Sequence, residues 1–420
     1  MILDLSTEVL RDILSYTLPY EDECLRTTWR KNLFDSPFHC LRAVCRPFRL
    51  IVAQLPFWCE PDFPLAYFRP SRNDRVGFLQ HILADPDIIK TLERKTEWRL
   101  TVDIIELMTD LLPSFYENAK SIHLQLEHSH PWEYIRSLPR PLFDTGMNIL
   151  GHSLQNLTSF SVQYGTTPIN LQVLTESLPS IERLTLKGSP KFIVGTLSLR
   201  YLREMEIEVV LPDQLSWRIS HILPIAATAT FQTLDIYGYT SPLTGIHQNK
   251  PLNPFVNLTT LRILPLDRHI AELVMEFPGR LRSFETLSFF TQDLDKSVLV
   301  FSAPCLQTLE NLRFHLAEST DEIAEMAVNL ITKITTLRKL DLSMKLDLQW
   351  YTYFSCLTSL ECLEWTTFEF VDRTAESLGI VWQGGDVSTV ARAKKAETVF
   401  TKAFDHCLAK PEMRFKVFEF

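Results

Sequence analysis

Glycine is scarce in this sequence, with 12 residues among 420. Neither Gly-x-x-x-x-Gly-Lys nor Gly-x-Gly-x-x-Gly occurs, which argues against a phosphate-binding loop of either common type. Basic residues are also in deficit, because 42 Lys and Arg stand against 51 Asp and Glu, for a net charge of −9. That balance counts against a general nucleic-acid binder, which needs a basic surface to neutralise phosphates.

Long apolar runs and paired cysteines are missing as well. No uncharged apolar run approaches the ~18 residues that suggest a membrane span, and Asp4 and Glu8 lie where a signal peptide would be basic. The eight cysteines form no Cys-x-x-Cys pair, and a chain of this length needs no disulfide framework. We therefore expect an intracellular protein, cytoplasmic or nuclear, in a reducing compartment.

Recognisable catalytic motifs are equally few. The segment 151–155 reads Gly-His-Ser-Leu-Gln and lacks the second glycine of a nucleophile elbow. Zinc could be considered at His123, Glu127, His128 and His130, but a zinc site needs three or four convergent ligands, and a polar strand end is the preferred interpretation. We expect no enzyme activity, no metal and no cofactor. An unrecognised site in the irregular stretch 126–154 is the alternative.

What the sequence does contain is one short phrase, repeated: apolar, two variable residues, apolar, one variable residue, apolar. It recurs every 21 to 29 residues, and its copies are Leu157/Phe160/Val162, Ile181/Leu184/Leu186, Leu202/Met205/Ile207, Phe231/Leu234/Ile236, Leu258/Leu261/Ile263, Phe284/Leu287/Phe289, Leu309/Leu312/Phe314, Leu337/Leu340/Leu342 and Leu360/Leu363/Trp365. Each copy places two side chains on one face of a strand, so the copies must stack to bury that face. The period is typical of leucine-rich repeats.

The repeat predicts an α/β fold: a leucine-rich-repeat solenoid with a curved parallel sheet and outer helices. Two earlier strands are expected at 98–102 and 122–124. Helical spacing between strands is found at 168–177, 267–276 and 321–334, the last preceded by a capping box at 319–322. A helix at 388–408 and a final copy of the phrase, Phe415/Phe418/Phe420, are expected to cap the C-terminal end.

The N-terminal segment has a different pattern. Apolar residues at helical spacing predict an amphipathic helix over 3–18, and a second apolar face covers 41–52 with Pro47 inside it. The first segment reads Leu5-Ser-Thr-Glu8-Val-Leu-Arg-Asp-Ile-Leu-Ser-Tyr16 and the second Leu41-Arg-Ala-Val-Cys-Arg-Pro-Phe48, followed by Phe57-Trp58. These residues resemble the F-box, and its fungal members in particular. Two departures are Ser6 in place of the usual Pro and a long insertion over 19–40.

An F-box followed by leucine-rich repeats resembles the F-box/leucine-rich-repeat proteins. The resemblance implies a substrate-recognition adaptor of a Skp–cullin–F-box ubiquitin ligase. Residues 1–60 would be the F-box-like helical module, 61–95 a connector with a short helix at 88–92, and 96–420 the solenoid with its cap. The implied adaptor-binding residues are Leu5, Glu8, Val9, Leu10, Ile13, Leu14, Val44, Cys45 and Phe48. The alternative is an interaction scaffold not linked to ubiquitination, in which the N-terminal helices only cap the stack.

Residues that flank the apolar positions of the phrase should point to the concave side of the solenoid. This row includes Arg183, Thr185, Lys187, Glu204, Glu206, Glu208, Thr233, Asp235, Tyr237, Arg262, Phe290, Arg313, His315, Lys339 and Asp341. The mixture of signs suits a polypeptide target better than a phosphate backbone. From this row the predicted target-binding residues are Arg183, Lys187, Glu204, Glu206, Arg262 and Arg313.

Overall fold

The computed structural model describes residue 9 and residues 85–101, 117–126, 142–151, 154, 156–165, 167–188, 193–195, 197–209, 230–238, 256–264, 271, 274–275, 277–288, 298–316, 321–343, 354, 356–367 and 412–417. The chain divides into two compact units, Met1–Leu184 and Thr185–Phe420, and each is considered by itself below. The predicted F-box-like module, apart from Val9, lies outside the described residues, as do Ser319 and Thr320 of the predicted capping box and the helix at 388–408.

Among the described residues of the first unit, three parallel strands follow one another in chain order, the two predicted ahead of the repeat phrase and the first that carries it. They are β1 (Glu97–Thr101), β2 (Ser121–Gln125) and β3 (Ser159–Gly165). Their register places Trp98 opposite Ile122, and Ile122 opposite Phe160. All three side chains are buried, as the repeat phrase predicts for its apolar positions. The short strand β4 (Ile169–Asn170) follows, and β5 (Arg183–Gly188) contains the division between the units.

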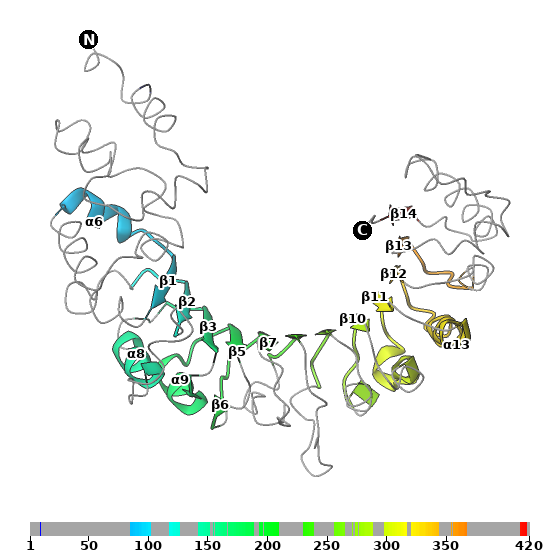
Figure 1. Cartoon of the computed structure of the whole chain (residues 1–420), viewed down its shortest axis with the longest axis horizontal. Helices are drawn as coiled ribbons and strands as arrows, with labels where there is room; N and C mark the ends of the chain where they lie inside the picture. Colours follow the sequence, from blue (N-terminus) through cyan, green and yellow to red (C-terminus); the bar gives the residue numbers. More distant parts are fainter. Residues whose placement is uncertain are drawn as a thin grey trace. The chain divides into compact units, whose positions relative to one another are not determined.

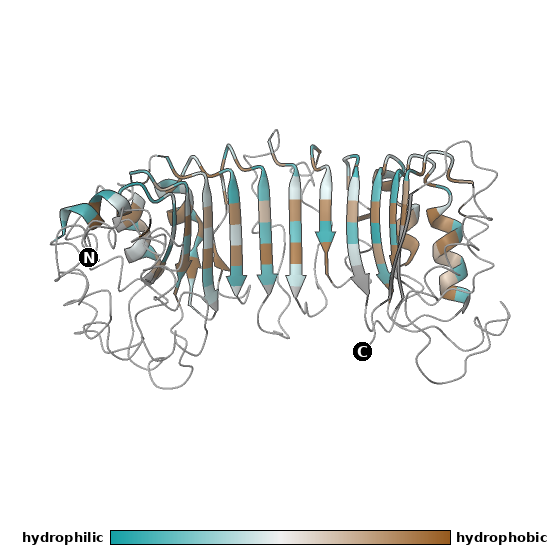
Figure 2. Cartoon of the chain, turned by 90° about the horizontal axis from the view of Figure 1, so that it is seen from above, coloured by the Kyte–Doolittle hydropathy of each residue, from teal (hydrophilic) through white to brown (hydrophobic). Residues whose placement is uncertain are grey.

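The second unit contains a longer parallel sheet whose strands also follow one another in chain order. Its strands are β7 (Glu204–Val209), β8 (Thr233–Gly238), β9 (Thr260–Ile263), β10 (Ser283–Ser288), β11 (Asn311–Leu316), β12 (Lys339–Ser343), β13 (Cys362–Thr367) and β14 (Glu412–Val417). The two-residue strand β6 (Ile193–Val194) precedes them. Figure 2 shows hydrophilic and hydrophobic residues alternating along these strands. The predicted α/β class with a parallel sheet is confirmed.

A recurrent backbone contact fixes the register of successive strands. Two consecutive N–H groups at most of the described strand entrances donate to one carbonyl of the preceding copy. Arg338 and Lys339 both donate to the carbonyl of Glu310, at 2.8 and 2.9 Å. Glu310 and Asn311 donate in the same way to the carbonyl of Arg282. Because the contact repeats in both units, it holds each apolar row opposite the next.

Helical segments are short and few among the described residues: α6 (Pro86–Leu92), α8 (Leu142–Gly151), α9 (Leu171–Ser177), α13 (Asp321–Ile331) and the 3-10 segments η9 (Leu299–Ser302) and η10 (Pro304–Leu306). α6, α9 and α13 confirm the predicted helices at 88–92, 168–177 and 321–334 with changed ends, and Ala271, Val274 and Met275 are helical within 267–276. α6 begins at Pro86, and the Asp85 carboxylate accepts from the N–H of Asp87 at 2.9 Å.

The expectation of an irregular stretch from 126 to 154 is wrong for its second half, which forms α8. Phe143, Met147 and Leu150 recur at helical spacing and are fully buried. Pro139, Pro141 and Gly146 punctuate the sequence there, which hid the period. α8 ends in close contact with α9, since a Cβ added at Gly151 would lie 2.9 Å from the Cβ of Ser177.

The structure corrects the register of two copies of the phrase. In β10, Phe284 lies opposite Leu261 and Leu312, so the copy is Leu281/Phe284/Thr286 and not Phe284/Leu287/Phe289. Thr286 is fully buried in the place of the third apolar residue. In β14, Phe415 lies opposite Trp365, so Phe415 ends the last copy instead of beginning it. The register predicted from the sequence was wrong in β10 because a threonine occupies the third apolar position of the phrase.

Candidate functional site

The sheet of the second unit has one buried face and one polar face. In β11, Leu312, Phe314 and Leu316 are buried, while the alternate residues Arg313 and His315 are not. The Phe314 ring lies 4.8 Å from the ring of Phe301 in η9, in an edge-to-face arrangement. The buried row therefore faces the helical segments, and the Arg313 row lies on the other face. Figure 1 shows α13 on the helical side of β11 and β12.

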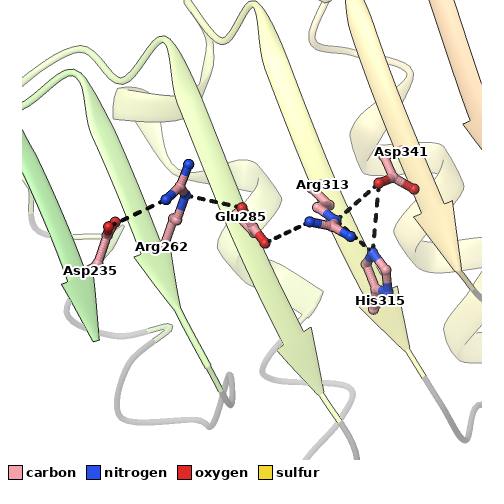
Figure 3. Close-up of polar contacts among 6 residues, drawn as sticks. All are labelled: Asp235, Arg262, Glu285, Arg313, His315 and Asp341. Carbon is pink, nitrogen blue, oxygen red and sulfur yellow. Dashed lines mark hydrogen bonds and ion pairs between the residues drawn. The ribbon is translucent and has the colours of Figure 1, made fainter. Parts of the chain in front are cut away.

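On the polar face, the in-register pairing brings five charged residues into one row. This row, here named the charge ladder, consists of Asp235, Arg262, Glu285, Arg313 and Asp341 on β8, β9, β10, β11 and β12. Acids and guanidinium groups alternate along it, so every strand pairing brings opposite charges together (Figure 3).

The distances show a continuous chain of ion pairs. Arg262 lies between two carboxylates, with Nη1 3.4 Å from Oδ2 of Asp235 and Nε 3.1 Å from Oε2 of Glu285. Glu285 in turn contacts a second guanidinium, since its Oε1 is 3.1 Å from Nη1 of Arg313. The Nε of Arg313 lies 3.0 Å from Oδ2 of Asp341. Glu285 is thus the central residue of the charge ladder, because it joins both arginines.

His315 is attached to the C-terminal end of the charge ladder. The Nε of Arg313 donates to Nε2 of His315 at 3.1 Å, and the same His315 nitrogen is 3.8 Å from Oδ2 of Asp341. Because a guanidinium can only donate, this hydrogen bond requires a lone pair on Nε2 and therefore a proton on Nδ1 of the neutral ring. Figure 3 shows the imidazole beneath the Arg313–Asp341 contact.

At the other end of the charge ladder, the surroundings of Asp235 are strongly acidic. Burial raises the pKa of Asp235 to about 6; Arg262 opposes this shift, and the negative charges of Glu206, Glu285 and Glu204 add to it. One carboxylate oxygen of Asp235 and one of Asp341 are buried without a hydrogen-bond partner in the described part of the chain. The charge ladder is therefore compensated at its centre and carries excess negative charge toward β7.

The predicted target-binding residues are distributed over this face and the strands beside it. Arg262 and Arg313 are the two bases of the charge ladder, and Arg183 is exposed at the start of β5. Glu204 and Glu206 are half-buried on β7, and Oε2 of Glu206 accepts from the hydroxyl of Thr185 at 3.2 Å. Lys187 is paired with Glu208 at 2.7 Å. Opposite charges on neighbouring copies thus pair with each other here.

Sequence reasoning missed Glu285 and placed Phe290 in the row instead. The cause is the register deviation in β10, because reading Phe284/Leu287/Phe289 as the phrase moves the polar-face positions along the chain. The signal that was available is the threonine at 286. Threonine is β-branched and is compatible with a strand, so Leu281-x-x-Phe284-x-Thr286 fits the phrase with one conservative change.

A shallow hollow of about 250 Å³ lies beside the charge ladder on β10–β12. Glu285, Arg313 and Asp341 form one side of it. The other side is formed by the row at the strand entrances, where Ser283, Asn311 and Lys339 are in register. The polar face therefore has a charged row whose members are paired, next to a row of hydroxyl, amide and amine groups.

Of the residues considered for zinc, the structure describes His123 alone. Nδ1 of His123 on β2 lies 2.8 Å from Oγ of Ser161 on the neighbouring strand β3. His128, His130 and Glu127 lie outside the described residues. Over the described ranges, no group of three or more His, Cys, Asp and Glu is placed to hold a metal ion. No helix in the same ranges is long and apolar enough to span a bilayer.

Of the nine predicted adaptor-binding residues, the structure describes one. Val9 is helical and 43% exposed. The others, Leu5, Glu8, Leu10, Ile13, Leu14, Val44, Cys45 and Phe48, lie outside the described residues. No protein-family model matches the chain, and the search of curated proteins found no match.

Proposed function

We propose that this chain is the substrate-recognition adaptor of a Skp–cullin–F-box ubiquitin ligase. Its N-terminal helices would dock a Skp-family adaptor, and a leucine-rich-repeat solenoid would hold the target protein for ubiquitin transfer by other subunits. The chain itself would provide proximity and no bond chemistry.

The observation that carries the target-binding half is the polar face of the parallel sheet. Its strands present side chains in register at regular spacing, which gives a broad surface with a fixed pattern of charge. Surfaces with mixed charge confer specificity for polypeptides through complementary potentials. The charge ladder holds its long side chains in defined positions through paired contacts, so less side-chain entropy is lost when a target binds.

The observation that supports the ligase half is the sequence of residues 5–16 and 41–48, together with the strands that follow. An exposed apolar Val9 on a helix is compatible with a docking face. The adaptor would contact the apolar side of that helix, where Leu10, Ile13 and Leu14 are expected from the helical spacing.

Affinity purification of the full chain tests this proposal. Leu10→Asp should abolish co-purification of a Skp-family adaptor, because it places an unpaired carboxylate in an apolar interface. Ser15→Asp is the matched control, since it adds the same charge on the predicted polar side of the helix and should retain the adaptor.

A wild-type chain that captures no Skp-family adaptor would refute the ligase assignment. Equal capture by the Leu10→Asp and Ser15→Asp variants would refute the docking face. In the first case the chain would instead be a leucine-rich-repeat interaction scaffold not linked to ubiquitination.

A further inference from the structure

A groove of about 970 Å³ runs along the strand entrances of the second unit, apart from the polar face described above. Its walls come from the segments that lead into β9, β10, β11, β12 and β13. Three arginines line it, Arg280, Arg282 and Arg338, against two glutamates, Glu310 and Glu361. A basic excess in this groove contrasts with the net charge of −9 of the whole chain.

The ion pairs of the groove leave two arginines uncommitted. Arg338 is paired with Glu361, at 3.4 Å between Nη1 and Oε1. Arg280 and Arg282 are exposed and have no side-chain ion pair or hydrogen bond to any other described residue. Glu310 is half-buried and its backbone carbonyl is occupied by the N–H groups of two residues at the next strand entrance.

Several backbone carbonyls at the strand entrances already accept hydrogen bonds. The carbonyls of Thr259, Arg282 and Glu310 each accept two backbone N–H groups at 2.8–3.0 Å. Threonine hydroxyls occupy others, since Thr308 donates to the carbonyl of Leu281 at 3.2 Å and Thr336 to that of Leu309 at 2.7 Å. The groove therefore offers a ligand two guanidinium groups without an ion pair and the hydroxyls of Thr358 and Ser359, against the single carboxylate of Glu310 that is not paired with Arg338.

We propose that this groove binds a carboxylate-rich segment of a partner protein. Guanidinium groups recognise carboxylates through charge-assisted, paired hydrogen bonds, and a lining with surplus donors suits a ligand with surplus acceptors. The groove passes five successive strand entrances, so its occupant is an extended Asp/Glu-rich segment that crosses the copies and places acidic side chains at Arg280 and Arg282. This site does not depend on the proposed function, because it uses neither the N-terminal helices nor the charge ladder.

The test is fluorescence anisotropy of a labelled ten-residue peptide of alternating Glu and Asp, titrated with the purified full chain and no other protein. Binding is expected for the wild type and should weaken as salt is raised, because exposed charge pairs are screened. The double variant Arg280→Gln/Arg282→Gln should raise the Kd by roughly tenfold or more. Arg280→Lys/Arg282→Lys should restore part of the loss, since lysine keeps the charge without the paired geometry.

A matched control removes two exposed charges elsewhere in the same unit. Arg200→Gln/Lys333→Gln has the same net charge as the first double variant, and neither residue lines the groove. It should bind the peptide like the wild type. The proposal is overturned if both double-glutamine variants bind equally well, or if the chain binds a ten-nucleotide single-stranded DNA more tightly than the peptide and through the same arginines. Adaptor capture is measured separately, so failure here leaves the ligase proposal intact.

Discussion

At the scale of single residues, Asp235 is the member of the charge ladder whose ionised form is disfavoured by its surroundings. It has one basic neighbour, Arg262, and three acidic residues that raise its pKa together with burial. Glu285 is in the opposite situation, because it lies between Arg262 and Arg313 at 3.1 Å from each. The position of a residue along the ladder thus decides whether its charge stabilises the fold.

The raised pKa of Asp235 predicts a specific pH dependence. Its pKa is about 6 in the folded chain and 3.8 without the protein environment, so the folded state holds the proton more tightly. The contribution of Asp235 to the free energy of unfolding is therefore greatest below pH ~4 and is lost as the pH rises past ~6. Asp235→Asn should remove this part of the pH profile and be neutral or stabilising at pH 7.5, measured by urea unfolding from pH 4 to 8.

A control with the same chemistry separates this effect from general loss of charge. Glu322→Gln changes an exposed carboxylate on α13 and should keep the wild-type profile. If Asp235→Asn and the wild type lose stability in parallel between pH 4 and 7, Asp235 does not titrate in that range.

The same scale shows where sequence reasoning succeeds and where it fails. Leu312, Leu340 and Leu363 could be assigned to the core because each copy is apolar at all three positions. Glu285 could not, because the buried Thr286 broke the apolar pattern and a plausible false copy lay three residues later. The pairing of Lys187 with Glu208 follows from register, and the sequence predicts register wherever the phrase is intact.

At the scale of elements, each strand is stabilised by the copies on both sides of it. Leu340 of β12 lies opposite Leu312 of β11 and Leu363 of β13, and all three are buried. Lys339 is on the other face of the same strand and is exposed. Elements outside the phrase were harder to predict: α8 has a buried helical face, but the prolines that precede it and the glycines within it resemble loop residues.

This asymmetry within β12 predicts unequal costs of truncation. Leu340→Ala should lower the free energy of unfolding by ~2–5 kcal/mol, because it leaves a cavity between neighbouring copies. Lys339→Ala should change it by no more than ~0.5 kcal/mol. Urea unfolding of the two variants checks both values, and equally mild effects would contradict the register of β12.

At the scale of the whole molecule, the distribution of charge within the second unit separates two surfaces by sign. The polar face is acidic toward β7 and β8, where Glu204, Glu206 and Asp235 lie in adjacent rows. The groove at the strand entrances carries the unpaired Arg280 and Arg282. Two surfaces of opposite charge can bind different parts of a partner, because a segment that is attracted to one surface is repelled by the other.

The acidic end of the polar face gives a prediction about target capture. Glu204→Lys/Glu206→Lys should lower the free energy of unfolding by no more than ~1 kcal/mol, because both residues are partly exposed and the new charges would be repelled by Lys187 of the neighbouring strand. Under the proposed function, the variant should lose the proteins that co-purify with the wild type through this face and still retain the Skp-family adaptor. Quantitative mass spectrometry of affinity-purified complexes measures both properties in one experiment.

The matched control for charge reversal is on the other face of the sheet. Glu322→Lys/Glu325→Lys introduces the same change of charge at two exposed positions of α13 and should retain both adaptor and targets. This control is needed because a change in the net charge of the whole chain, from acidic toward neutral, by itself alters association with many proteins. Loss of the same targets by both variants would mean that total charge controls capture. Retention of all targets by Glu204→Lys/Glu206→Lys would remove β7 from the binding surface and leave the central charge ladder and its hollow as the place to test next.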